Sequence, residues 1–274
     1  TEDITADACR RDFKCNAVYY DIKARAFVDP LGGIEEIKNG VISTVVAAEK
    51  VFGEDGLRLM RLCRIAAQTG FTPSKECVDG ARKNRAMLND IAAERVWAEL
   101  SALLRADIKY GVAQAQYAGL CIMRDTGVLA TLLPELAAGD GMEQRADFHS
   151  HDVLEHTLRC VRYAPVNIRL AALLHDVGKP YCKNVLGKFA GHETEGERIA
   201  GEICARLKAP KRVAERTCEL VRWHMYDLSG ATSPNKVRKF IVRHLDILDD
   251  LLALKQADYS ACKDDLSVAP CVKR

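Results

Sequence analysis

The chain has 274 residues, which is enough for two compact domains or several stacked helical modules and too many for one hydrophobic core. Hydrophobic residues make up 48% and proline contributes only 8 residues, and this composition excludes a disordered chain. A net charge of +2 excludes a protein whose overall field attracts nucleic acid or an acidic membrane, so any basic surface must be local. The basic stretch 58–85 is one candidate, for which a solvated helical face is an equal alternative.

Eleven cysteines are scattered from Cys9 to Cys271. Their odd number and the absence of a C-x-x-C pair argue against a disulfide framework and a zinc knuckle, so we expect small core residues in a reducing compartment. The sequence contains no apolar run of membrane-spanning length, and residues 1–11 are polar and charged, unlike a signal peptide. We therefore expect a cytoplasmic protein without a membrane partner.

The first predicted elements are a strand-like stretch at 15–22 and a second short strand or turn near 26–28. A tight turn is predicted at 29–33, because its paired glycines permit positive φ. From Pro30 onward the period is helical, and no strand-like alternation of useful length returns. The predicted fold is mainly α with a short residual β segment, and loop residues at 139–142 predict a domain boundary.

All seven histidines lie after residue 148, in a region that we expect to form an all-helical domain to about residue 260. Divalent metal needs imidazoles and carboxylates from several helices, because one helix presents only neighbours three or four residues apart on one face. Each histidine taken singly fits a core or surface position better than a metal site, but the set together favours a metal site. The candidates are His156, His175, Asp176, His192, His224 and Asp258.

The order H…HD…H…H…D, with Val-Gly-Lys-Pro at 177–180, resembles the HD phosphohydrolase superfamily in its tRNA-processing branch. The resemblance implies hydrolysis of a phosphoester by water activated on a divalent metal, which would be Mg²⁺, Mn²⁺ or Ni²⁺. His175 and Asp176 would be catalytic, and Lys179 would supply charge at the leaving oxygen; a C-terminal helix residue paired with the dipole is the alternative for Lys179. The implied first metal shell is His156, His175, Asp176 and Asp258, with His192 and His224 extending the site toward a second metal or the phosphate.

Three motifs in order, at 10–17, 29–36 and 54–61, resemble consecutive motifs of the class II CCA-adding enzyme and bacterial poly(A) polymerase family. Stretches at 94–100 and 127–135 resemble the neck and body of that family, so the resemblance covers essentially the whole chain. It implies that Asp55 and Arg58 select the incoming CTP or ATP. It also implies that Arg11 and Asp12 contact the sugar or triphosphate, and that Arg61 belongs to the nucleotide site.

A physical reason supports the third motif independently of the family. Asp55, Arg58 and Arg61 are spaced by three, so on a single helix successive members are near neighbours. A carboxylate acceptor beside a guanidinium donor can read the hydrogen-bonding edge of a base. An ordinary intrahelical salt bridge is the alternative for these residues.

The chain also departs from the family pattern. Lys14 stands where the family usually has Thr, and Glu36 where it usually has Asp. Nothing corresponds to the first family motif, a glycine-rich strand-turn followed by two aspartates that hold the catalytic magnesium ions. We therefore expect no nucleotide addition by this chain alone.

These observations predict an N-terminally truncated tRNA nucleotidyltransferase. Residues 1–50 would be the remnant of the head, 51–141 a helical neck and body that binds nucleotides and tRNA, and 142–274 an all-α HD domain. The expected partners are the tRNA acceptor arm, ATP and CTP. Two alternatives remain open, a stand-alone HD phosphohydrolase and a non-catalytic RNA-binding scaffold with steeply salt-dependent tRNA binding.

Overall fold

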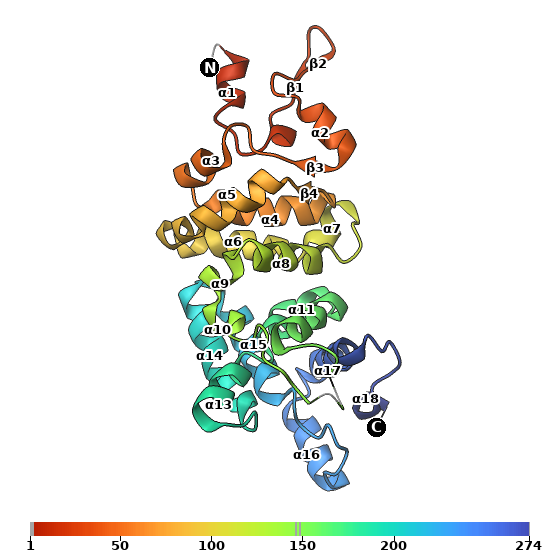
Figure 1. The fold of residues 1–274 in the computed structure, drawn as a ribbon. Helices are drawn as coiled ribbons and strands as arrows, with labels where there is room; N and C mark the ends of the chain where they lie inside the picture. The colour runs from red at the N-terminus through yellow and green to blue at the C-terminus, as the bar shows by residue number, and fades with distance from the viewer. Residues whose placement is uncertain (1–2, 146, 148, 274) are drawn as a thin grey trace. The chain divides into compact units, whose positions relative to one another are not determined.

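The computed structural model describes residues 3–145, 147 and 149–273 (Figure 1). The chain forms two compact units, Thr1–Leu132 and Leu133–Arg274. The 139–142 loop lies inside the second unit, and the domain limits at 50/51 and 141/142 stay predictions. Residues 1 and 274, the outer limits of the predicted domains, and residue 148, near which the predicted histidine-rich helical region starts, lie outside the described residues.

The first unit begins with short elements and continues as packed helices, as predicted. The predicted strand at 15–22 is shorter in the structure, where a 3-10 turn precedes three strand residues. Its early elements are α1 (Ile4–Ala8), η1 (Lys14–Asn16), β1 (Tyr19–Asp21), β2 (Ala26–Val28), α2 (Gly33–Asn39) and β3 (Val41–Ile42). Its later elements are α3 (Ala48–Glu54), α4 (Leu57–Thr69), β4 (Thr72–Pro73), α5 (Lys75–Asn84), η2 (Arg85–Asp90), α6 (Ala93–Leu103), α7 (Ala106–Tyr110), α8 (Ala115–Asp125) and α9 (Val128–Leu132).

Strand pairing is minimal and partly unexpected. β1 and β2 pair antiparallel, with Tyr19 opposite Val28. After Pro30, where no strand of useful length was expected, β3 and β4 form a parallel pair of two residues each. Such a short pairing leaves no alternation in the sequence, because period 2 needs more residues to become visible.

The two departures from the family pattern, Lys14 and Glu36, contact each other. Lys14 Nζ lies 3.3 Å from a Glu36 carboxylate oxygen, and the other Glu36 oxygen accepts a hydrogen bond from Ser43 N at 3.0 Å. The two residues that differ from the family pattern therefore form an ion pair with each other, which explains how both are accommodated.

Helix α4 is central to the helical part of the first unit and packs against α6, α7 and α8. Its buried face includes Leu59, Leu62 and Cys63. Burial raises the pKa of the Cys63 thiol to about 12, as expected for a core cysteine. Five cysteines are buried, whereas Cys9 is exposed, so the expectation of core cysteines holds for only part of the set.

The second unit contains only helices within its described residues, in agreement with the predicted all-α class. They are α10 (Pro134–Ala137), α11 (Val153–Tyr163), η3 (Val166–Ile168), α12 (Arg169–Leu174), α13 (Gly178–Leu186), α14 (His192–Arg206), α15 (Lys211–Trp223), α16 (Pro234–Arg243), α17 (Leu248–Lys263) and α18 (Pro270–Lys273). Every residue of α12 is buried, and this helix contacts α11, α15 and α17. Within the described residues of the whole chain, no helix has the length and apolar character needed to span a membrane.

Candidate functional site

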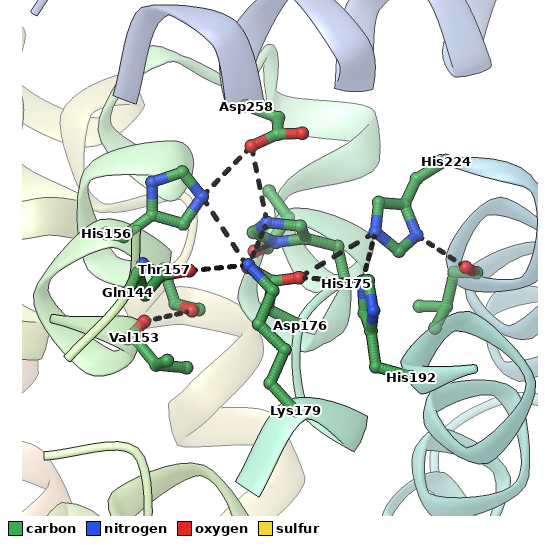
Figure 2. A network of polar contacts seen from close by, with 12 residues as sticks. Gln144, Val153, His156, Thr157, His175, Asp176, Lys179, His192, His224 and Asp258 are labelled. Atoms are coloured by element: carbon green, nitrogen blue, oxygen red, sulfur yellow. Dashed lines mark hydrogen bonds and ion pairs between the residues drawn. The ribbon is translucent and has the colours of Figure 1, made fainter. Parts of the chain in front are cut away.

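Five helices supply the side chains that the sequence predicts as metal ligands, and these side chains converge (Figure 2). Asp152 begins α11 because its carboxylate accepts a hydrogen bond from Glu155 N at 2.7 Å, and Gly191, with φ +91°, turns the chain into α14. The converging residues are His156 on α11, His175 and Asp176 directly after α12, His192 at the first position of α14, His224 directly after α15, and Asp258 on α17.

Asp176 lies at the centre of this cluster, with one oxygen facing each of two histidine pairs. His175 Nε2 lies 3.2 Å and His156 Nε2 3.6 Å from Asp176 Oδ2. His192 Nε2 lies 3.3 Å and His224 Nε2 3.8 Å from Asp176 Oδ1, and the two Nε2 atoms are 3.2 Å apart. The carboxylate therefore joins two adjacent groups of ligand atoms.

Asp258 completes the first group. Its Oδ1 atom lies 2.9 Å from His156 Nε2 and 3.7 Å from His175 Nε2. The Nε2 atoms of His156 and His175 are buried and have no hydrogen bond of good geometry among the described residues. In each of two groups, Asp176 with His156 and His175 or Asp176 with His192 and His224, one ligand atom from each residue lies within 4.8 Å of the other two. Buried imidazole nitrogens that have no hydrogen-bond partner and lie beside carboxylates suit the binding of a divalent cation.

Backbone carbonyls orient three of the histidines. The Nδ1 atoms of His175, His192 and His224 lie 2.8, 2.9 and 2.7 Å from the carbonyl oxygens of Ala172, Phe189 and Val221, respectively. A protonated Nδ1 donating to a carbonyl leaves Nε2 free to bind metal, which is the usual arrangement of histidine ligands. Each partner is three residues earlier in the chain, so the local helical turn itself sets the orientation.

The buried charges are strongly coupled. Burial acts to raise the pKa of Asp176, but His175 and Lys179 outweigh it and hold that pKa well below its usual range. Burial acts to lower the pKa of His175, but Asp176 outweighs it and raises that pKa. Burial lowers the pKa of His224. Asp176 is therefore a carboxylate at neutral pH, as a metal ligand must be.

Lys179 also reaches the cluster. It lies in the first turn of α13, so the alternative of a C-terminal helix residue paired with the dipole is wrong. Its Nζ atom is 2.7 Å from Asp176 Oδ2 and donates a hydrogen bond to Gln144 Oε1 at 2.6 Å. No motif or spacing in the sequence pointed to Gln144. His149, whose ring centroid is 4.8 Å from that of His156, was detectable only as another histidine in the same region.

The close approach of α13 and α14 behind the cluster requires glycine at position 178. A Cβ atom on Gly178 would lie 2.2 Å from the His192 carbonyl oxygen and 2.6 Å from Gly196 N. We expect Gly178→Ala to destabilise the protein by at least the ~1–3 kcal/mol typical of overpacking and to displace His192. Chemical denaturation and metal titration of the variant test this.

Gly201→Ala on the same helix α14 is the matched control. The nearest neighbour of an added Cβ there is Cys218 Sγ at 3.7 Å, which is ordinary contact. Alanine is favoured over glycine inside a helix by about 0.5–1 kcal/mol, so this variant should be slightly more stable. Equal stability of the two variants would contradict the close packing at Gly178.

A second site lies in the first unit, where a cavity of about 610 Å³ is lined by all five residues predicted to bind nucleotide. They are Arg11, Asp12, Asp55, Arg58 and Arg61. Cations outnumber carboxylates around the cavity, which suits an anionic ligand. The lining cations are Arg10, Arg11, Arg58, Arg61, Arg64, Arg95 and Lys109, and the lining carboxylates are Asp12 and Asp55.

The predicted local geometry of the third motif was wrong. Asp55 is not on one helix with Arg58 and Arg61; it has extended backbone after α3, and its side chain caps α4 by accepting from Leu57 N at 3.0 Å. Aspartate side chains compete for backbone N–H groups at helix starts, and spacing by three does not reveal this. The nearest cation recorded for Asp55 is Arg95, at 3.4 Å.

Arg58 and Arg61 have partners in other segments. Arg58 donates to the carbonyl oxygens of Val51 at 3.1 Å and Arg10 at 2.9 Å, and its salt bridge is with Glu54. The Asp55–Arg58 salt bridge, the alternative for this motif, is therefore not the pairing seen. Arg61 Nε donates to Asp12 Oδ2 at 2.6 Å, which holds both predicted residues at the cavity wall.

Part of the basic stretch 58–85 forms a local basic surface, and part of it is a solvated helical face. Arg58, Arg61 and Arg64 line the cavity, whereas Lys75 and Lys83 are exposed and pair with surface carboxylates. Arg64 was not predicted as a site residue; its Nε atom donates to Glu99 at 2.6 Å.

Comparisons with known proteins match successive segments of the chain. Three family models match, the poly A polymerase head domain over 1–43, the probable RNA and SrmB-binding site of polymerase A over 70–139, and the HD domain over 148–259. The A-adding tRNA nucleotidyltransferase of Deinococcus radiodurans is 34% identical, over 94% of this chain and 60% of its own length. The multifunctional CCA protein of Chromobacterium violaceum is 36% identical, over 74% of this chain and 50% of its own length.

Solved structures show the same fold. The CCA-adding enzyme of Bacillus stearothermophilus in complex with CTP matches 99% of this chain and 58% of its own, with a TM-score of 0.62 at 22% identity. A tRNA nucleotidyltransferase complexed with a primer tRNA and an incoming ATP analogue matches 96% of this chain and 70% of its own, with a TM-score of 0.60 at 18% identity.

The helical architecture and the ordered matches define a protein of the class in which a poly A polymerase head segment and an RNA-binding segment precede an HD domain. In agreement with the resemblance that its motifs predicted, the chain is similar in sequence to A-adding and CCA-adding tRNA nucleotidyltransferases and shares the fold of solved CCA-adding enzymes. It spans about three fifths or less of the length of the two relatives described above.

Proposed function

We propose that this chain is the nucleotide- and RNA-binding part of a tRNA nucleotidyltransferase that adds CMP and AMP to tRNA 3′ ends, and that its HD domain hydrolyses phosphoesters. The observation that carries the hydrolase proposal is the position of Asp176, with one carboxylate oxygen facing each histidine pair. Nucleotide addition by this chain alone is not expected, because none of its residues match the aspartate motif that holds the catalytic magnesium ions.

The HD cluster offers two adjacent positions for divalent metal, which would be Mg²⁺, Mn²⁺ or Ni²⁺. His156, His175, Asp176 Oδ2 and Asp258 would hold the first, and Asp176 Oδ1 with His192 and His224 the second. Bound metal lowers the pKa of its water and so supplies hydroxide near neutral pH.

Other groups around the cluster would orient the histidine rings and neutralise negative charge. The carbonyl contacts at the Nδ1 atoms of His175, His192 and His224 fix each ring with Nε2 toward Asp176. Lys179, which contacts both Asp176 and Gln144, would supply positive charge at a leaving oxygen that develops negative charge.

In the first unit, the arginine-rich cavity would bind CTP or ATP. Asp55 and Arg58 would select the base, Arg11 and Asp12 would contact the sugar or triphosphate, and Arg61 would belong to the same nucleotide site. The residues 70–139, which match a probable RNA-binding model, would contact the tRNA acceptor arm. The excess of cations around the cavity supports this assignment, because a nucleoside triphosphate is strongly anionic.

Hydrolysis of 2′,3′-cyclic AMP tests the HD proposal. We expect turnover when Ni²⁺, Mn²⁺ or Mg²⁺ is added to the metal-free chain, and none in excess chelator, because the histidine and carboxylate cluster acts through metal. Absence of turnover with all three ions would contradict the hydrolase proposal and favour a vestigial HD site.

Measurements of tRNA binding and of hydrolysis distinguish the two alternatives that the sequence left open. A stand-alone phosphohydrolase would hydrolyse the cyclic nucleotide without measurable affinity for tRNA. A non-catalytic RNA-binding part would bind tRNA with steep salt dependence and show no hydrolysis. The proposed function requires both activities in one chain.

A further inference from the structure

His156 differs from the other histidines of the metal cluster. The Nδ1 atoms of His175, His192 and His224 each face a backbone carbonyl, but the Nδ1 atom of His156 is buried and has no hydrogen-bond partner among the described residues. The His156 side chain is fully buried, so solvent does not satisfy this nitrogen. A buried polar atom without a partner is rare in folded proteins and calls for an explanation.

Two other ligand-forming side chains lie beside His156. The His149 ring lies edge-on to the His156 ring, with centroids 4.8 Å apart, and its Nδ1 atom is also buried without a partner in the described part of the chain. Cys262 follows Asp258 by four residues on α17, so one face of this helix delivers both side chains to the cluster. One ligand atom from each of His149, His156 and Cys262 lies within 4.8 Å of the others.

This trio has different chemistry from the two groups around Asp176. It contains a thiol and two imidazoles, and such ligands favour Zn²⁺, Co²⁺ or Cd²⁺ over Mg²⁺ or Mn²⁺. We infer that His149, His156 and Cys262 form a separate site for a thiophilic divalent cation such as Zn²⁺, with water as the remaining ligand.

The His149 imidazole of the trio is already in the form that binds metal, whereas the thiol must lose a proton. Burial lowers the pKa of His149 to about 4, so its imidazole is neutral at physiological pH. Burial raises the pKa of the Cys262 thiol to about 12, so this side chain is a neutral thiol without metal; a bound cation has to displace the thiol proton to solvent, and affinity should rise with pH.

The site shares His156 with the proposed phosphohydrolase centre, so its effect on activity rests on the proposed function. His156 Nε2 also lies 2.9 Å from Asp258 and 3.6 Å from Asp176. A cation held by His149 and Cys262 draws His156 away from those carboxylates. Zn²⁺ therefore inhibits the activity that Mn²⁺ or Mg²⁺ supports.

Titration of the metal-free chain with Co²⁺ tests the site without any enzyme assay. We expect a near-ultraviolet sulfur-to-cobalt charge-transfer band in the wild type. Cys262→Ser should abolish this band, because no thiolate remains at the site, and His149→Gln should weaken Co²⁺ binding by about tenfold or more. Cys218→Ser changes another half-buried cysteine of the same unit and should retain the band.

Persistence of the band in Cys262→Ser, or its absence from the folded wild type, would overturn the site. Circular dichroism of each variant shows whether it has folded. The second readout is inhibition by Zn²⁺ of the Mn²⁺-dependent hydrolysis of 2′,3′-cyclic AMP, which should be relieved in Cys262→Ser. If the chain lacks hydrolase activity, the cobalt spectrum still decides the site, so failure of the proposed function and failure of this inference are distinguishable.

Discussion

Replacing His175 and Asp176 together with alanine is expected to abolish metal-dependent hydrolysis of 2′,3′-cyclic AMP and to remove bound metal from the HD cluster. Asp176 contributes an oxygen to each of the two ligand groups, and His175 contributes Nε2 to the first. Loss of supporting residues around a metal typically costs about 10–100-fold, so loss of central ligands should cost more. Calorimetric metal titration and the hydrolysis assay measure both effects.

Single variants sharpen this prediction. His192→Ala removes one ligand of the second group only, so it should reduce the number of bound metal ions without emptying the first position. His151→Ala is the control, because His151 is partly exposed and its recorded carboxylate contact is with Asp264. Full metal retention by the His175→Ala/Asp176→Ala protein would contradict a metal site at the HD cluster.

The Asp55→Ala/Arg58→Ala variant is expected to lose any preference for CTP and ATP over GTP and UTP. Both side chains line the cavity, and a good bidentate contact to a base edge is worth about 1–3 kcal/mol of discrimination. Equilibrium binding of the four nucleotides to the chain measures the preference directly. Unchanged discrimination would remove the assignment of Asp55 and Arg58 as the base-reading pair.

Matched variants separate recognition from folding in this region. Arg58 also holds the carbonyl oxygens of Arg10 and Val51, so its removal loosens the cavity wall. Asp55→Asn keeps a side-chain oxygen for the helix cap but changes the pattern of donors and acceptors, so it should alter preference with little loss of stability. Glu54→Ala removes only the outer partner of Arg58 and should leave discrimination unchanged.

The identity of the candidate metal ligands was more predictable from the sequence than their geometry. Histidines and carboxylates placed at helix ends in a fixed order indicated convergence, and the structure brings all six predicted residues together. The contact of Gln144 with Lys179 was not predictable, because it joins residues 35 positions apart without any pattern in the chain. The buried face of His156 toward His149 and Cys262 likewise depends on how α11 meets α17.

By itself, the sequence determined the helical class, the family resemblance and the identity of the candidate ligands, because hydrophobic period, loop residues and ordered motifs are local properties of the chain. Only the tertiary structure decided that Asp176 joins two ligand groups, that Asp55 caps α4 instead of sharing it with Arg58, and that Lys14 pairs with Glu36. Packing sets such contacts, and spacing along one chain does not encode the distance between atoms on different helices.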